Sequence, residues 1–225
     1  GEAFVVRDHF AQALPDDARL QLPWWDAMGL RYLLTTAPMQ FGGKRVGPEL
    51  RGPGGEFYIY ERESALPRAW VVPELQVTTD EEQAVTAIIQ PDFAPRERAI
   101  ITEAAATDLP EIPADQASKA RRVEFRYEDL KRLTLAVGEG PAGYLVVADT
   151  ELPGWSASID GVPAPIARAN VYQRLVPIPA GPCTVNFRYR TPGLLAGLTI
   201  SSAAVLILVW LVIRALRQRR PRQPA

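Results

Sequence analysis

The sequence has very little cysteine and histidine, with one residue of each, Cys183 and His9. A single cysteine excludes a disulfide within the chain, and one sulfur cannot build a thiolate metal cluster. A single histidine argues against zinc sites and catalytic arrangements that need two. Because Cys183 lies in the alternating run CTVNFRYR (183–190), we interpret it as a small buried apolar residue. We predict no metal site and no cofactor.

Phosphate-binding motifs are missing as well. The glycine-rich piece Gly52-Pro53-Gly54-Gly55 has neither the GxxxxGK[ST] nor the GxGxxG spacing, so no nucleotide site is predicted. Basic residues are concentrated at the end of the chain. Residues 214–225 carry five arginines and no acid, which leaves 20 basic and 26 acidic residues in 1–213. An acidic body with a basic tail argues against nucleic acid as a partner and fits a membrane protein.

The longest apolar run is Leu194–Ile213 (LLAGLTISSAAVLILVWLVI), 20 residues without a charge or a proline. A helix of this length rises about 30 Å, the hydrocarbon thickness of a bilayer. Trp210 lies near the end that meets the arginines, where interfacial indoles are common. The alternative is a buried core helix, which the length and the abrupt arginine flank disfavour. We therefore predict one transmembrane helix at 194–213, with the lipid bilayer as a partner.

Orientation in the membrane follows from the arginines. Basic residues stay on the cytoplasmic side, so the tail 214–225 is predicted to be cytoplasmic and residues 1–192 extracytoplasmic. The chain opens GEAFVVRDHF, with neither an initiator Met nor a signal-peptide pattern. We expect either that a signal has been removed or that the sequence is a piece of a longer protein.

Residues 1–103 combine helix-like and strand-like patterns and are predicted to form a small α+β subdomain. The stretch DDARLQLPWWDAMGL (16–30) is helix-like, and strands are expected at 31–36, 56–63, 69–72 and 99–102. Thr79 as N-cap and Glu82 have the spacing of a capping box, which predicts a helix through Ile89. The segment 104–120, rich in Ala, Pro and acids, is interpreted as a linker or exposed loop.

From residue 121 onward apolar and polar residues alternate, which is the period of β-strands. Strands are predicted at 121–128, 131–137, 143–149, 155–160, 162–168, 171–178 and 183–190. Asp160-Gly161 is typical of a type I′ hairpin, and GYLVVAD (143–149) is apolar enough to be a central strand. About seven short strands favour an antiparallel β-sandwich, jelly-roll or immunoglobulin-like, at 121–192. The predicted fold class is mainly β with an α+β N-terminal part, followed by one transmembrane helix.

The corner Pro153-Gly154-Trp155 has two interpretations. In the mechanical one, Pro fixes a dihedral, Gly permits an unusual one and Trp fills the space at the end of the sandwich. In the functional one, Trp155 forms a platform for a sugar or lipid-linked sugar together with Asp149, Arg168 and Asn170. The indole face would stack on sugar C–H groups, while carboxylate, amide and guanidinium groups would bond the hydroxyls.

Two other pairs of residues each have a structural and a functional interpretation. Asp149 and Glu151 suit a general acid/base or divalent-cation pair, but solvated loop acids are the simpler explanation. Trp24-Trp25 is interpreted as a packing anchor, and contact with the lipid interface or with a membrane core is the alternative.

The segment GYLVVADTELPGWSASIDGVPAPIARANVYQRLVPIPAGPCTVNFRYR (143–190) resembles the C-terminal signature of the YfhO-like bacterial membrane proteins. The shared pattern is a strand ending in Asp-Thr, a Pro-Gly-Trp, an Asp-Gly turn, an Arg-x-Asn and a Pro-Ala-Gly turn, then a final strand and a transmembrane helix. MGLRYLLTT (28–36) and FYIYERESALPRAWVV (57–72) are similar to two further family segments, so the resemblance covers most of residues 26–213.

This resemblance implies a large polytopic parent protein similar to the GT-C glycosyltransferases. Such enzymes take a sugar from a polyprenyl-phosphate carrier and transfer it outside the bacterial cytoplasmic membrane, here to an envelope polymer such as lipoteichoic acid. Their catalytic carboxylate lies in an early outer loop that this chain does not contain, so no catalytic residue is carried over. The partners implied are the membrane-embedded remainder of the parent and a polyprenyl-phosphate sugar or envelope glycan.

Three hypotheses about function remain open at this point. The chain is an accessory outer domain of a GT-C-like glycosyltransferase, a membrane-tethered module that binds envelope glycan, or a purely structural module that stabilises or oligomerises a membrane protein. An aromatic and polar cleft around Trp155 would favour the first two over the third.

Overall fold

The computed structural model describes residues 22–40, 43–47, 50–52, 55–112 and 121–218. The chain divides into two compact units, Gly1–Arg188 and Tyr189–Ala225. Some of the predictions concern residues outside the described ranges: His9, the helix-like stretch from Asp16 to Gln21, linker residues 113–120, and Arg219, Arg220 and Arg222.

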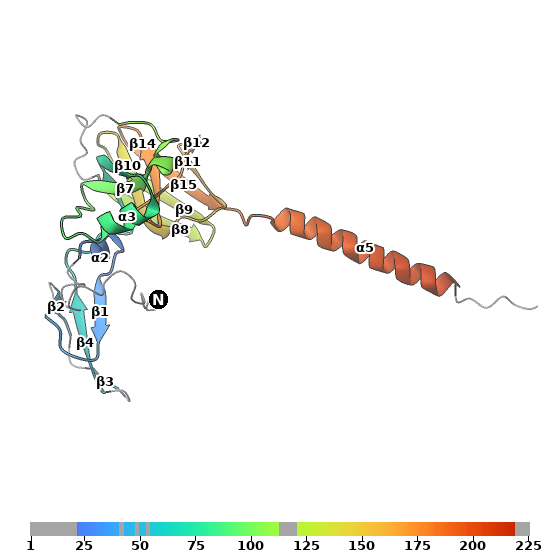
Figure 1. The fold of residues 1–225 in the computed structure, drawn as a ribbon, viewed down its shortest axis with the longest axis horizontal. Coiled ribbons are helices and arrows are strands. Elements are labelled where there is room, and N and C mark those ends of the chain that lie inside the picture. The colour runs from blue at the N-terminus through green and yellow to red at the C-terminus, as the bar shows by residue number, and fades with distance from the viewer. Residues whose placement is uncertain (1–21, 41–42, 48–49, 53–54, 113–120, 219–225) are drawn as a thin grey trace, which may run out of the picture. The chain divides into compact units, whose positions relative to one another are not determined.

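Short strands dominate the first unit (Figure 1). The strands are β1 Tyr32–Thr35, β2 Lys44–Arg45, β3 Leu50–Gly52, β4 Gly55–Glu61, β5 Ala69–Val72, β6 Glu74–Thr78, β7 Arg98–Thr102, β8 Val123–Asp129, β9 Arg132–Val137, β10 Gly143–Thr150, β11 Trp155–Ile159, β12 Val162–Ala164, β13 Ala167–Ala169, β14 Gln173–Ile178 and β15 Cys183–Tyr189. The helices are α2 Trp24–Ala27, α3 Glu81–Ile88, α4 Glu103–Ala106 and, in the second unit, α5 Leu194–Gln218.

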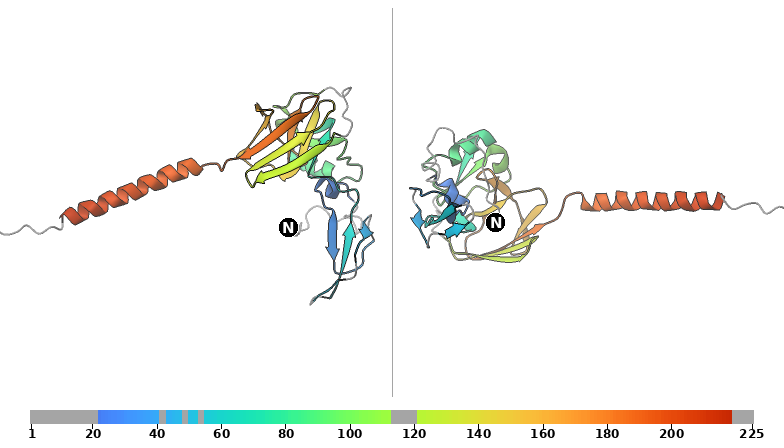
Figure 2. Two further views of the ribbon diagram at one scale, coloured as in Figure 1. Left: turned by 180° about the vertical axis from the view of Figure 1, so that it is seen from behind. Right: turned by 90° about the horizontal axis from the view of Figure 1, so that it is seen from below.

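Two sheets pack face to face as a β-sandwich. One has the strand order β12-β11-β15-β9-β8, and the other has the order β13-β14-β10-β5. The pairs β9–β15 and β10–β14 are antiparallel. The left view of Figure 2 shows β8, β9 and β15 side by side in the first of these sheets. Buried residues from both sheets meet between them, including Leu133, Leu135, Val185 and Phe187 from one and Leu145, Val147 and Val176 from the other. The predicted fold class is therefore confirmed.

The four-stranded sheet is covered on its second face as well. Strands β6 and β7 run parallel with α3 between them in sequence, and they pack with α4 against the face that carries Trp70, Val146 and Leu175. Every residue of β14 is buried, and so are the first five of β10. Burial on both faces explains why Tyr144–Val147 of β10 and Leu175–Ile178 of β14 are continuous apolar runs instead of alternating patterns.

The N-terminal part of the chain contributes directly to the sandwich. Strand β5 lies inside the range 1–103 that the sequence predicts as a subdomain, yet it pairs with β10, Trp70 opposite Val146. Ala27 of α2 also belongs to the apolar cluster on the second face of that sheet. Pairings between residues so distant in sequence leave no trace in local periodicity, which is why the pattern did not indicate them.

Helix α3 begins one residue later than the capping-box spacing predicts. The N-cap is Asp80, which has an extended backbone and whose side chain accepts a 2.8 Å hydrogen bond from the Gln83 amide. Gln83 Oε1 in turn accepts from the Thr79 amide at 3.5 Å. Asp80 is at least as good a cap as Thr79, and its charge also suits the positive end of the helix. Further on, α4 occupies the start of the predicted linker, with Thr102 as its cap.

A smaller sheet is built around β4, which pairs with β1, β2 and β3. Its apolar cluster contains Tyr58 and Tyr60, with Leu33 and Met39 packed against them. Just after β4, Arg62 makes a buried ion pair of 2.7 Å with Asp26 of α2, and so ties this sheet to the helix before it.

The Asp160-Gly161 hairpin forms as predicted. Strands β11 and β12 are antiparallel with Ile159 opposite Val162, which leaves a two-residue loop. Asp160 has φ 49° and Gly161 has φ 87°, the pair of positive values that a type I′ turn requires.

The second unit consists mainly of α5. Its segment Leu194–Ala215 is long and apolar enough to cross a membrane, and none of its most apolar window is buried within the protein. A core helix would be mostly buried, so the exposed helix supports the membrane interpretation over that alternative. The guanidinium of Arg214 lies 5.4 Å from the ring centre of Trp210 at the end of the span.

Candidate functional site

Asp149 lies half-buried near the end of β10, two residues after the fully buried part, and pairs with two guanidinium groups. Its Oδ2 lies 2.8 Å from Nη2 of Arg174, and its Oδ1 contacts Arg68. The Arg174 side chain is only 2 % exposed, whereas that of Arg68 is 54 % exposed. Asp149 therefore neutralises a buried cation, which favours a structural role for this carboxylate.

Arg174 is stacked between aromatic rings inside the sandwich. Its guanidinium carbon lies 4.0 Å from the ring centre of Trp155 and 5.2 Å from that of Phe187. Trp155 packs in the same cluster as Ala157 and Ile159, its alternate neighbours on β11, so its indole faces the interior. These contacts favour the mechanical interpretation of the Pro-Gly-Trp corner. Gly154 has φ 110°, the unusual dihedral that this corner demands.

Asn170 is completely buried in a polar network. Its Oδ1 accepts from the Ile100 amide at 2.9 Å, and its Nδ2 donates to Gln173 Oε1 at 2.8 Å. Gln173 Nε2 donates in turn to the Ala27 carbonyl at 2.7 Å. Asn170 has φ 47°, a left-handed conformation that asparagine tolerates. Its side-chain amide therefore joins β7 to Gln173 of β14, and Gln173 continues the network to α2.

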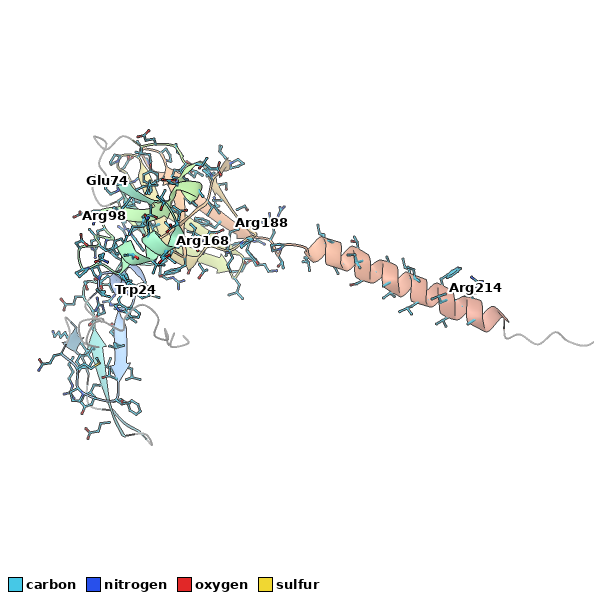
Figure 3. The ribbon with its side chains drawn as sticks, viewed as in Figure 1. Trp24, Glu74, Arg98, Arg168, Arg188 and Arg214 are labelled. Carbon is cyan, nitrogen blue, oxygen red and sulfur yellow. The ribbon has the colours of Figure 1, made fainter. Side chains whose placement is uncertain are left out.

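Arg168 lines an open groove with its exposed guanidinium, whereas Asn170 contributes to the lining of a separate, apolar hollow. The groove has a volume of about 390 Å³ and lies beside β13, α3 and α4. The Arg168 guanidinium, 45 % exposed, pairs with Glu81 at 3.0 Å and with Glu151 at 3.5 Å. Figure 3 labels this arginine beside α3. Asp108 adds another carboxylate, and the apolar lining includes Ala105, Leu109 and Ile166.

A strained residue borders the Arg168 groove. Val171 has φ 73°, which is rare for a β-branched side chain. It lines both the groove and a neighbouring apolar hollow of about 230 Å³, formed by residues that include Trp24, Ile88 and Tyr172. Strain of this kind persists only where the surroundings impose it, here through buried Asn170 on one side and Tyr172 on the other.

Burial raises the pKa of two groups near these residues. The pKa of Tyr172 rises from 10.0 to about 12, chiefly because the phenol is desolvated; the Gln173 hydrogen bond opposes this rise and the charge of Asp149 adds to it. Burial also raises the pKa of the Cys183 thiol, which fits its predicted role as an inert core residue. Within the ranges that the structure describes, no group of three His, Cys, Asp or Glu side chains could hold a metal ion.

The four residues predicted as a sugar platform are thus divided between different environments. Asp149 and Trp155 meet around Arg174, Asn170 lies in a separate buried network, and Arg168 faces the groove. Sequence reasoning did not identify Arg174, although a lone charge in the apolar strand QRLVPI is a usable signal for a buried ion pair. It also did not place Glu81 and Asp108 near Arg168, because only the fold brings them together.

Comparison with known proteins gives no further identification. No family model matches the chain, and no curated protein or solved structure matches it significantly.

Proposed function

We propose that this chain is a membrane-anchored extracytoplasmic module that binds glycan at the Arg168 groove. In this proposal it is the outer C-terminal region of a YfhO-like bacterial membrane protein, and it assists transfer of sugar from a polyprenyl-phosphate carrier to a cell-envelope polymer. The transfer chemistry belongs to a catalytic core outside this chain. The observation that carries the proposal is the groove itself, where one guanidinium and several carboxylates surround an apolar lining.

The groove has the chemistry of a sugar site. Carboxylates accept hydrogen bonds from neighbouring hydroxyls, a guanidinium donates to ring and hydroxyl oxygens, and small apolar side chains contact sugar C–H groups. Glu81 and Glu151 hold Arg168 from two sides, which fixes its orientation before any ligand arrives. The proposal differs from the sequence-based one in its residues, because Arg168 takes its partners from α3 and the end of β10 instead of from Trp155.

The test uses the full chain in a nonionic detergent and a panel of neutral oligosaccharides, with binding measured by calorimetry. We expect Arg168→Ala and Glu151→Gln to weaken binding at least tenfold. Arg122→Ala is the matched control, since Arg122 is also an exposed arginine but pairs with Glu124 away from the groove. Equal binding by wild type and Arg168→Ala would rule out this groove as the site. Turnover of a polyprenyl-phosphate sugar by this chain alone would refute the separate catalytic core.

A structural role is the second candidate, and a specific observation favours it. Three of the four predicted platform residues, Asp149, Trp155 and Asn170, make internal contacts. If the role is purely structural, no oligosaccharide binds, and Asp149→Ala lowers the amount of assembled parent protein while Arg168→Ala does not.

A further inference from the structure

The outer face of the five-stranded sheet carries two arginines directly opposite each other. Arg188 of β15 is paired in register with Arg132 of β9, so both side chains leave the same face of neighbouring strands. Side chains in such a pair have Cβ atoms roughly 4.5–5.5 Å apart, and like charges placed there repel. Both arginines are exposed, and Figure 3 labels Arg188.

The carboxylates near this pair compensate only one of the two arginines. Arg132 Nε lies 3.4 Å from Asp129 in an exposed contact, which is weak in water. Among the residues that the structure describes, Arg188 makes no ion pair. Glu124, on the neighbouring strand β8, is already shared between Arg122 and Arg126. The face therefore keeps an excess of positive charge at the Arg132–Arg188 pair.

A groove runs beside the two arginines, and polar side chains form much of its lining. It has a volume of about 360 Å³, and its polar lining also includes Thr134, Ser156, Ser158 and Asn186. The Ser156 hydroxyl donates to the Arg188 carbonyl at 3.1 Å, so Ser158 is the serine whose hydroxyl faces the groove without that bond. The Thr134 hydroxyl donates to Asn186 Oδ1 at 2.8 Å, which leaves the Asn186 NH₂ group to donate elsewhere. Among the side chains that the structure describes, no carboxylate lines this groove.

We propose that the Arg132–Arg188 groove binds a phosphate group. Two guanidinium groups lining one groove suit a tetrahedral oxyanion, to which each can donate more than one N–H hydrogen bond. Bound phosphate would also remove the repulsion between the opposed charges, so binding and stability would be linked. The site belongs entirely to the first unit and does not depend on glycan binding at Arg168.

The primary experiment titrates the full chain, in a nonionic detergent at low ionic strength, with glycerol phosphate. We expect Arg132→Gln/Arg188→Gln to weaken binding at least tenfold, and the matched control Arg122→Gln/Arg126→Gln to stay within twofold. The control removes the same charge from the same sheet but leaves the groove intact. The corresponding double lysine variant keeps the charge but loses the fork, and should fall between wild type and the glutamine variant.

Unfolding temperature provides a second readout that distinguishes this site from a structural pair. Without phosphate, Arg132→Gln/Arg188→Gln should unfold at the same or a higher temperature than wild type, because repulsion is relieved. With glycerol phosphate, the unfolding temperature should rise for wild type and the control but not for this variant. A lower unfolding temperature of the variant without phosphate, together with unchanged binding, would overturn the proposal.

A second titration identifies the source of the phosphate. Micelles containing phosphatidylglycerol replace glycerol phosphate, with the same variants and control. Binding of glycerol phosphate that depends on the arginine pair assigns the site to a water-soluble phosphate. Pair-dependent binding of phosphatidylglycerol alone assigns it to a lipid headgroup. If neither probe depends on the pair, or if the control loses as much binding, the proposal is wrong.

Discussion

Arg168 and Arg174 lie opposite each other on the neighbouring strands β13 and β14, yet they differ greatly in their surroundings. The Arg168 side chain is 45 % exposed and lines a groove, whereas the Arg174 side chain is 2 % exposed and stacks on Trp155. Each has its carboxylate near the end of the same strand, β10: Glu151 for Arg168 and Asp149 for Arg174. Two similar ion pairs thus occur side by side in different dielectric environments.

Both pairs consist of an arginine and a carboxylate, so residue type does not distinguish them. What differs is whether the second sheet covers the pair, and this determines how much the pair matters for stability. β13 is an edge strand, so Arg168 reaches round to Glu81 and remains in water. β14 is an inner strand beneath β11 and β15, so the charge of Arg174 must be matched inside the protein. A buried charge without its partner is costly, whereas an exposed pair contributes little to stability.

The largest effect is expected from Asp149→Ala. It leaves the buried Arg174 guanidinium without its carboxylate, and we expect a loss of about 3 kcal/mol in the free energy of unfolding. Glu151→Ala is the matched change at the exposed pair and should cost about 0.5 kcal/mol or less. Urea unfolding of the full chain in detergent, followed by tryptophan fluorescence, measures both. If both variants lost the same free energy of unfolding, burial would not make the Asp149–Arg174 pair more important for stability than the Glu151–Arg168 pair.

Trp155→Ala comes next. It removes the ring on which Arg174 stacks and leaves a cavity, for which we expect a loss of about 2 kcal/mol, less than for a fully buried tryptophan. Trp155→Phe retains an aromatic face and should cost about 1 kcal/mol. Thermal unfolding by circular dichroism gives the order of the two variants. If Trp155→Ala unfolds like wild type and loses glycan binding instead, Trp155 is a ligand platform and not an internal contact.

Much of this fold was predictable because its signals are local. The Asp160-Gly161 turn needs two positive φ values that few other residue pairs allow, and Leu194–Ile213 is a run of 20 residues without a charge. The alternation from residue 121 onward predicted a strand at 131–137, and its apolar positions Leu133, Leu135 and Val137 are the buried face of β9. These features depend on neighbours within a few residues.

The site was less predictable because it depends on contacts between distant residues. Asp149, Trp155, Arg168 and Asn170 are close in sequence, which suggested one surface. The fold instead turns Trp155 inward, buries Asn170 against β7 and takes the partners of Arg168 from α3. The N-cap of α3 is Asp80 instead of the predicted Thr79 for a related reason. The two adjacent residues cap helices about equally well, so only the backbone geometry at the start of the helix decides which of them is the cap.

The double substitution Asp149→Leu/Arg174→Met tests whether the buried pair itself is needed. Replacing a buried ion pair by apolar side chains of similar size is often neutral, so we expect stability within about 1 kcal/mol of wild type. Arg68 would lose its contact with Asp149 but can be solvated, as its side chain is 54 % exposed. The difference in stability between this double variant and Asp149→Ala, measured in the same urea experiment, is the cost of burying the Arg174 charge without the Asp149 carboxylate. A loss as large as that of Asp149→Ala would mean that the pair makes a net contribution to stability.

The smallest effect is expected in the pH dependence of stability that Tyr172 causes. Tyr172 lies near both ion pairs, but only the charge of Asp149 affects its pKa. Its pKa is about 12 in the folded protein and near 10 when unfolded, with burial the main cause and Asp149 a minor one. Between pH 10 and 12 the unfolded state loses this proton first, so stability falls as pH rises through that window.

In Tyr172→Phe, stability should fall less steeply over the same pH range. Asp149→Asn should reduce the slope slightly, because its charge helps to keep the phenol protonated, while Glu151→Gln should leave the slope unchanged. The opposite result would be a change in the pH dependence of stability with Glu151→Gln and none with Asp149→Asn. It would mean that the charge of Glu151, and not that of Asp149, affects the pKa of Tyr172.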